Sequence, residues 1–293
     1  ATESGIVTID YTDTPVAGRT NSLTLGATYT ADATVKIGVN TDTVDASAYV
    51  NALTITSDID SITTADTFTG GTGSSDKLTI TLDGTADTAL AAADIASITA
   101  IETFEFSTNL SAGITLHDSN IASGGALTVD GTALTGSSTV LTVVGTAETN
   151  GILTVLGGAG ADVITGTAST SGDVLNGNAG NDSFVFASAN FTSADTIDGG
   201  AGTTDTIQIS DSATVVDADF TNVTNTEKIL FDVAGTLTIG DVAQAAGLTT
   251  IANTDSAGAL TLTIDADYTS NLTISLVTNN DTITGTAYTS DLT

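Results

Sequence analysis

Residues 157–185 read GGAGADVITGTASTSGDVLNGNAGNDSFV. The first nine and the last nine of these residues match the nonapeptide G-G-x-G-x-D-x-U-x, in which U is a large apolar residue and Asn178 replaces the second glycine. Between them, GTASTSGDVLN is an imperfect copy of eleven residues. Glycine permits backbone conformations that expose carbonyl oxygens, and aspartate adds a charged oxygen ligand. The pattern therefore indicates glycine-rich turns suited to a hard cation.

The rest of the chain favours strands. Its 293 residues are rich in Val, Ile, Leu, Ala and Thr, whereas Lys and Glu are scarce. Runs such as LTITL, LTVLG, LTLTI and LTISL alternate apolar and small polar residues and are bounded by Gly, Asp, Asn or Ser. We expect an all-β protein of repeated, solenoid-like parallel β-roll or β-helix segments with β-sandwich-like modules. Two short helices are expected, at 85–98 and 240–251.

A larger module is present twice. The segment DTFTGGTGSSDKLTI at 66–80 returns as DTIDGGAGTTDTIQI at 195–209, and a block starting at residue 152 returns from residue 271 in the same order. We therefore divide the chain into an N-terminal β segment or partial module at 1–65, a first β module at 66–194 and a truncated second copy at 195–293. Because the second copy stops in mid-repeat, we expect the natural chain to continue.

The nonapeptides resemble those of the RTX (hemolysin-type) calcium-binding repeat proteins. In that family six residues form a turn and three form a short strand of a parallel β-roll, and ions lie between turns on the same side. The resemblance implies several Ca²⁺ ions. The ligands it implies in the contiguous repeats are Asp162 and Asp182 with the carbonyls of Gly157, Ala159, Gly177 and Ala179, while Asp173 serves the opposite edge.

Two isolated turns resemble the same motif with one extra residue before the second aspartate. Their candidate ligands are Asp66, Gly70 and Asp76 in one turn, and Asp195, Gly199 and Asp205 in the other. We expect a weaker site or none at Asp281, which has lost the glycines. The expected inner face of the contiguous repeats is Val163, Ile164, Val174, Leu175, Phe184 and Val185. We also expect Phe104, Phe106, Phe184, Phe186 and Phe231 in the core.

The charge balance excludes some functions. Four basic residues face 35 acidic ones, for a net charge of −31, so nucleic-acid phosphates would be repelled. There is no cysteine to form a disulfide, and calcium can take that stabilising role. No run of apolar residues is long enough to predict a transmembrane segment. Two simpler explanations are that the acids provide solubility in salty surroundings and that the turns hold no ion.

The motif pattern also suggests a function. The combination of ITAIETFEF, VTNTEKILF, LTV strands and GGAGAD turns resembles the β-rich regions of calcium-dependent bacterial surface-layer (S-layer) proteins. This implies an extracellular structural protein that assembles with itself into an S-layer or a filament or matrix, with cell-surface polysaccharide as a further partner and type I secretion as the export route. The alternatives are the calcium-rigidified stalk of an RTX adhesin, or a non-catalytic part of a secreted RTX enzyme or toxin.

We do not expect an enzyme. His117 is the only histidine, so no two-histidine metal site can form within this chain. Neither a G-x-S-x-G motif nor a P-loop is present. The sequence therefore predicts no catalytic residue and no cofactor other than calcium.

Overall fold

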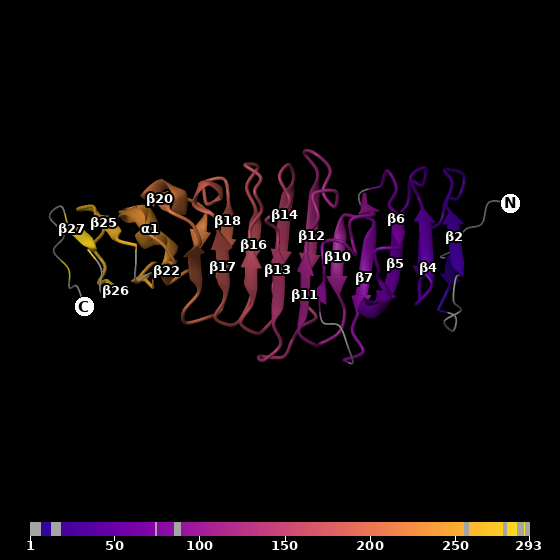
Figure 1. Ribbon diagram of the computed structural model, residues 1–293, viewed down its shortest axis with the longest axis horizontal. Helices are drawn as coiled ribbons and strands as arrows, with labels where there is room; N and C mark the ends of the chain where they lie inside the picture. The colour runs from indigo at the N-terminus through magenta and orange to yellow at the C-terminus, as the bar shows by residue number, and fades with distance from the viewer. Residues whose placement is uncertain are drawn as a thin grey trace.

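The structure, a computed structural model, describes residues 7–12, 19–73, 75–84, 89–254, 258–277, 280–285 and 290. These residues form an elongated β-solenoid, with β2 and β27 at opposite ends of its long axis (Figure 1). All strand pairs between described residues are parallel. The predicted all-β solenoid is confirmed.

Two long sheets run along the solenoid. The ten-stranded sheet consists, in order, of β1 (Val7–Asp10), β3 (Ala33–Lys36), β5 (Leu53–Asp58), β7 (Lys77–Thr81), β10 (Thr103–Phe106), β12 (Ala126–Asp130), β14 (Ile152–Leu156), β16 (Val174–Asn176), β18 (Thr196–Asp198) and β21 (Val223–Thr224). The nine-stranded sheet consists of β8 (Ala89–Leu90), β11 (Ala112–Thr115), β13 (Leu141–Val144), β15 (Val163–Thr165), β17 (Ser183–Phe186), β19 (Thr206–Ile209), β22 (Lys228–Phe231), β24 (Thr250–Asn253) and β26 (Thr273–Leu276).

Two four-stranded sheets complete the solenoid. One contains β2 (Thr20–Thr24), β4 (Thr41–Asp45), β6 (Thr67–Thr69) and β9 (Ile98–Thr99), and the other contains β20 (Ala213–Val215), β23 (Gly235–Ile239), β25 (Leu260–Ile264) and β27 (Thr282–Gly285). From β12 to β19 the chain alternates strand by strand between the two long sheets. Strands before β8 alternate between the ten-stranded sheet and the first four-stranded sheet, and strands after β21 alternate between the nine-stranded sheet and the second.

The quoted glycine-rich stretch spans more than one coil of this solenoid. Thr154 pairs with Val174 across the ten-stranded sheet, and Val163 pairs with Ser183 across the nine-stranded sheet, so each step is 20 residues. One nine-residue repeat and the eleven-residue copy together supply this length. The longer copy is therefore the second half of a coil and causes no break in the stack.

Apolar side chains stack in columns inside the solenoid. One column runs through Leu78, Phe104, Val129, Val155, Leu175 and Ile197, which pair in register and are at most 1% exposed. The expected inner face is confirmed for Ile164, Leu175 and Phe184. It is wrong for Val163 and Val174, which are 38% and 41% exposed, and for the half-buried Val185. Successive side chains of a strand point to opposite faces. In the three-residue strands β15 and β16 only the central residue points inward, and in β17 Val185 points outward between the buried Phe184 and Phe186.

The phenylalanines expected in the core are there. Phe104, Phe106, Phe184, Phe186 and Phe231 are all at most 1% exposed. Phe186 packs against Phe191 with ring centroids 5.5 Å apart. Phe191 in turn meets Phe220 edge to face at 5.3 Å. Phe186, Phe191 and Phe220 are each 1% exposed, so these three rings pack together inside the solenoid.

Helices are short and lie at the corners. The helix expected within 240–251 is confirmed as α1 (Asp241–Ala246), which ends at Gly247 with a left-handed φ of 105°. Three 3₁₀ turns are also present: η1 (Ile59–Ser61), η2 (Ser188–Asn190) and η3 (Asp217–Phe220). The helix expected at 85–98 is wrong where the chain is described, and residues 85–88 lie outside that part. There Leu90 pairs with Ile114 in the nine-stranded sheet, since stacking on a preformed sheet overrides weak local helix propensity.

The sheets continue across the positions where the sequence divides into modules. β17 and β19 lie on either side of residue 195 and pair with each other over four residues. The strands expected in β-sandwich-like modules join the same parallel sheets. Within the described residues, no helix has the length and apolar character needed to cross a membrane.

Candidate metal centre

A row of carboxylates crosses the coils at the start of the strands in the nine-stranded sheet. We call Asp162, Asp182, Asp205 and Glu227 the carboxylate ladder. Oδ1 of Asp162 accepts the Leu141 N–H at 2.7 Å, Oδ1 of Asp182 accepts the Asp162 N–H at 2.7 Å, and Oδ1 of Asp205 accepts the Asp182 N–H at 2.7 Å. Glu227 Oε2 accepts the Asp205 N–H at 2.8 Å. Each carboxylate thus binds the backbone of the coil before it.

Shorter rows of the same kind lie at other strand starts. On the ten-stranded sheet, Asp195 accepts the Asp173 N–H at 2.8 Å, and Asp173 accepts the Leu153 N–H at 3.4 Å. Asp76 accepts the Leu53 N–H at 2.9 Å on the same sheet. Asp173 precedes β16 of the ten-stranded sheet, whereas Asp162 and Asp182 precede strands of the nine-stranded sheet. Asp76, Asp173 and Asp195 are buried and not solvated. Because their side chains accept N–H groups of the neighbouring coil, these turns hold two coils together in addition to reversing the chain.

The predicted carboxylate ligands fall into two groups according to whether their second oxygen, Oδ2, accepts a hydrogen bond. In most of them this oxygen accepts a hydrogen bond within its own turn: from Thr63 to Asp66, from Gly71 to Asp76, from Gly158 to Asp162, from Thr167 to Asp173 and from Thr192 to Asp195. Oδ2 of Asp182 and Oδ2 of Asp205 are buried and have no hydrogen-bond partner among the residues that the structure describes. The residues themselves are 1% and 0% exposed. These two neighbouring carboxylates therefore have an oxygen available for a cation.

Glycines let the backbone wrap tightly around these two oxygens. A methyl group at Gly177 would lie 2.1 Å from Asp182 Oδ2, and one at Gly202 would lie 2.6 Å from Asp205 Oδ2. Asn178, at the second glycine position of its repeat, has a left-handed φ of 65°. Asparagine tolerates this conformation better than most residues do, which explains why the repeat accepts it.

The predicted carbonyl ligands lie in the same stacked turns. The Gly157 carbonyl accepts a hydrogen bond from Asn178 Nδ2 at 2.7 Å, so it already has one donor. Ala179 forms a parallel bridge with Ala201 of the next coil. The Ala159 N–H donates to the Leu134 carbonyl of the preceding coil at 2.8 Å. Gly70 and Gly199 lie beside Asp76 and Asp205, where a methyl group would come within 2.9 and 2.8 Å of a carboxylate oxygen.

Burial makes the buried aspartates weaker acids. It raises the pKa of Asp182 to about 7, and the neighbouring charges of Asp162 and Asp205 add to this effect. Burial likewise raises the pKa of Asp173 to about 6. The pKa values of Asp162, Asp195 and Asp205 are raised for the same reason. A protonated carboxyl fits such an environment without a cation, whereas the charged form needs a positive partner.

We predict that the calcium-free protein loses stability as the pH rises. A carboxyl whose folded-state pKa lies above its unfolded value binds more protons in the folded state, so its contribution is present near pH 4 and is lost as the pH approaches about 7. For Asp182 alone the loss is at most about 4 kcal/mol. Urea unfolding of protein stripped of calcium on a chelating resin, followed across this pH range, measures it.

The matched control for this prediction is Asp173→Asn combined with Asp182→Asn. This variant removes the two carboxyls with the most strongly raised pKa and should flatten the pH dependence. If the variant and the natural protein lose stability in parallel, the general repulsion among the 35 acidic residues is responsible instead.

Sequence reasoning missed two members of these rows. Glu227 ends the carboxylate ladder, and Glu102 accepts the Asp76 N–H at 2.8 Å. The usable signal is their position one residue before a strand, in ETFEF and EKILF, where DKLTI and DTIQI have aspartate. Because burial raises the pKa of Glu102, it resembles the aspartates electrostatically as well.

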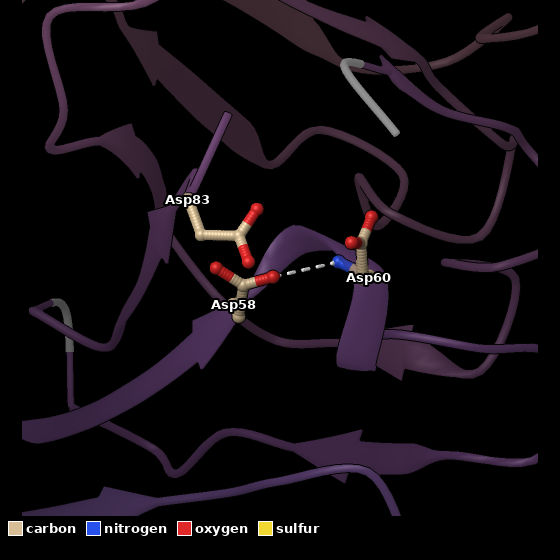
Figure 2. Close-up of side chains that lie close together, drawn as sticks. All are labelled: Asp58, Asp60 and Asp83. Atoms are coloured by element: carbon tan, nitrogen blue, oxygen red, sulfur yellow. Dashed lines mark hydrogen bonds between the residues drawn. The ribbon is translucent and has the colours of Figure 1, made fainter. Parts of the chain in front are cut away.

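A separate acidic cluster was also missed. Asp58, Asp60 and Asp83 bring carboxylate oxygens within 4.8 Å of one another. Figure 2 shows the three side chains lying close together. Asp58 Oδ1 accepts the Asp60 N–H at 3.2 Å and so caps η1, and its Oδ2 accepts from the Thr81 hydroxyl at 3.4 Å. Asp83 is exposed. The capping role accounts for the place of Asp58 without an ion.

Comparisons with protein-family models, with curated proteins and with solved structures give no match to this chain. Function must therefore be argued from the solenoid and its carboxylates.

Proposed function

We propose that this chain is a secreted, calcium-binding structural protein of the bacterial cell surface, related to the RTX repeat proteins, that assembles into an S-layer or an extracellular filament. The observation that carries the proposal is the pair of buried oxygens, Asp182 Oδ2 and Asp205 Oδ2, which have no hydrogen-bond partner. Only four basic residues exist in the sequence to offset 35 acids. A divalent cation supplies the missing positive charge, and oxygen ligands in flexible turns favour calcium.

The role of the metal is to stabilise the folded coils. Bound calcium neutralises carboxylates that must otherwise be protonated when buried. Asp182 and Asp205 hold it together with carbonyl oxygens of the glycine turns. Because calcium binds the folded chain, it stabilises it by about 2.7 kcal/mol for one site when its concentration is 100 times the dissociation constant. In a cytoplasm with little calcium, repulsion at a net charge of −31 opposes the compact state.

Self-assembly is supported by the repetitive sides of the solenoid. Stacked coils present parallel strands at regular intervals along two long sheets, and such repeating surfaces suit contacts between copies of the chain. The strong negative charge opposes such contacts until cations screen it, so association should depend on calcium. Cell-surface polysaccharide stays a predicted partner with no assigned residues.

The adhesin stalk is a second candidate, favoured by the elongated solenoid of Figure 1. A rod with β2 and β27 at opposite ends suits a spacer between an anchor and a binding domain. Neither candidate requires catalysis. His117 Nδ1 lies 2.9 Å from the Ser119 hydroxyl within its own corner turn, which is a local contact.

Negative-stain electron microscopy in calcium and in EGTA tests the function. We expect ordered arrays or filaments in calcium that dissolve in EGTA and return when calcium is restored. Isolated rods in calcium would favour the stalk over the S-layer. Assemblies and far-ultraviolet circular dichroism that do not respond to EGTA would contradict the role of calcium altogether.

A further inference from the structure

The corner turn of residues 145–151, between β13 and β14, contains a buried acid outside the glycine nonapeptides. Glu148 is 0% exposed. Its Oε1 accepts the N–H groups of Asn150 and Gly151 at 2.9 and 3.1 Å. Its Oε2 is buried without a hydrogen-bond partner, and so is Oδ1 of Asn150. The turn thus buries two acceptor oxygens for which no described residue supplies a donor.

Equivalent turns elsewhere in the solenoid have a different residue at the position of Glu148. Glu148 comes four residues after Val144, the last residue of β13, and its N–H donates to the carbonyl of Gly145. Tyr49, Leu134 and Tyr268 have the same position and the same bond. The hydroxyls of Tyr49 and Tyr268 donate to carbonyls of the preceding coil, at Ala31 and Leu248. The fold therefore accepts a donor or an apolar group here, and the turn itself does not require a carboxylate.

No basic side chain of the sequence lies in this turn or in its flanking strands. Lys77 lies on β7, three strands away from β14 in the ten-stranded sheet, or roughly 14 Å. Asp118 of the preceding coil lies on the outer side of the turn, where its Oδ1 accepts from the Thr149 N–H at 3.1 Å and from Asn150 Nδ2 at 3.5 Å. The amide nitrogen of Asn150 thus faces Asp118, so the Oδ1 of Asn150 points away from Asp118. The charged side chain that contacts this turn is therefore another acid, Asp118.

We propose that the 145–151 turn binds one divalent cation of the calcium type through Glu148 Oε2 and Asn150 Oδ1. A carboxylate and an amide oxygen are both normal calcium ligands, and water completes the coordination. The site stands on its own observations and does not depend on the ions proposed at Asp182 and Asp205. It adds a calcium position at a corner that carries no G-G-x-G-x-D motif.

Native mass spectrometry with calcium chloride tests this site by counting bound ions. The variant Glu148→Gln keeps the shape and the Oε1 acceptor but removes the charge. It should bind one ion fewer than the natural protein. In EGTA the same variant should melt at a temperature no lower than that of the natural protein, because it no longer buries an uncompensated charge. Asp130→Asn is the matched control, since its carboxylate accepts only from Thr132 in the turn that contains Leu134.

Two results would overturn the site. One is an ion count unchanged by Glu148→Gln. The other is a melting temperature lowered equally in calcium and in EGTA, which would make Glu148 only a structural acceptor for its own turn. A triple variant separates this site from the proposed function. The double variant Asp182→Asn, Asp205→Asn should still bind one ion at the 145–151 turn, and adding Glu148→Gln to this background should remove that ion. If the background binds as many ions as the natural protein, the glycine-turn sites fail while this one stands.

Discussion

Replacing Phe184 by alanine is expected to lower the free energy of unfolding by about 3–5 kcal/mol. Phe184 is 0% exposed and stacks in register between Ile164 and Ile207 of the neighbouring coils. Removing the ring leaves a cavity that the sheets on either side cannot close without breaking register. Urea titration followed by circular dichroism measures the loss, and it should be similar in calcium and in EGTA because the contact is apolar.

The control for this prediction is Val163→Ala on the neighbouring strand. Val163 is 38% exposed and points away from the core, so its truncation should change stability by about 0.5 kcal/mol or less. Equal effects of the two substitutions would contradict the assignment of inner and outer faces.

The double variant Asp182→Asn, Asp205→Asn is expected to change stability in opposite directions with and without calcium. In both residues the asparagine Oδ1 still accepts the N–H of the coil before, and an amide replaces the unpartnered charged Oδ2. In EGTA at neutral pH the variant should therefore be the more stable protein. In calcium it should be less stable by about 2.7 kcal/mol for each ion it loses, when calcium is at 100 times its dissociation constant.

Thermal unfolding in calcium and in EGTA measures both effects. Asp45→Asn with Asp130→Asn serves as the control, since it removes two negative charges at exposed carboxylates that accept only within their own turns. A double variant that is destabilised equally in both buffers would show that Asp182 and Asp205 act as backbone caps and nothing more.

The fold could be predicted from the sequence because two signals agreed. Alternating runs such as LTVLG predict strands, and the spacing from GGAGAD to GNAGND predicts how far apart stacked strands lie along the chain. The sequence could not predict that, near β8 and β20, the chain changes the pair of sheets between which its strands alternate. This change depends on the shape of the coil and leaves no local sequence pattern. Ala89 and Leu90 illustrate this: their local sequence favours helix, yet Leu90 pairs with Ile114.

The candidate site was only partly predictable. The motif identified Asp162 and Asp182 and placed Asp173 at the opposite edge. It could not separate Asp162, whose two oxygens both accept hydrogen bonds, from Asp182, which has one free oxygen. That difference arises because Asp162 Oδ2 receives the Gly158 N–H of its own turn. Glu148 has no motif, and its unpartnered oxygen can be recognised only from the folded turn.

The carboxylate ladder has a direction along the solenoid. Asp182 closes the backbone of the coil before it, and Asp205 does the same for the coil of Asp182. Along the ladder, each coil is therefore completed by a carboxylate that comes later in the chain. Insertion or loss of a whole coil preserves this order. Insertion or loss of part of a coil would put a strand residue at the position of the carboxylate. We therefore expect insertions and deletions in solenoids of this type to comprise whole coils.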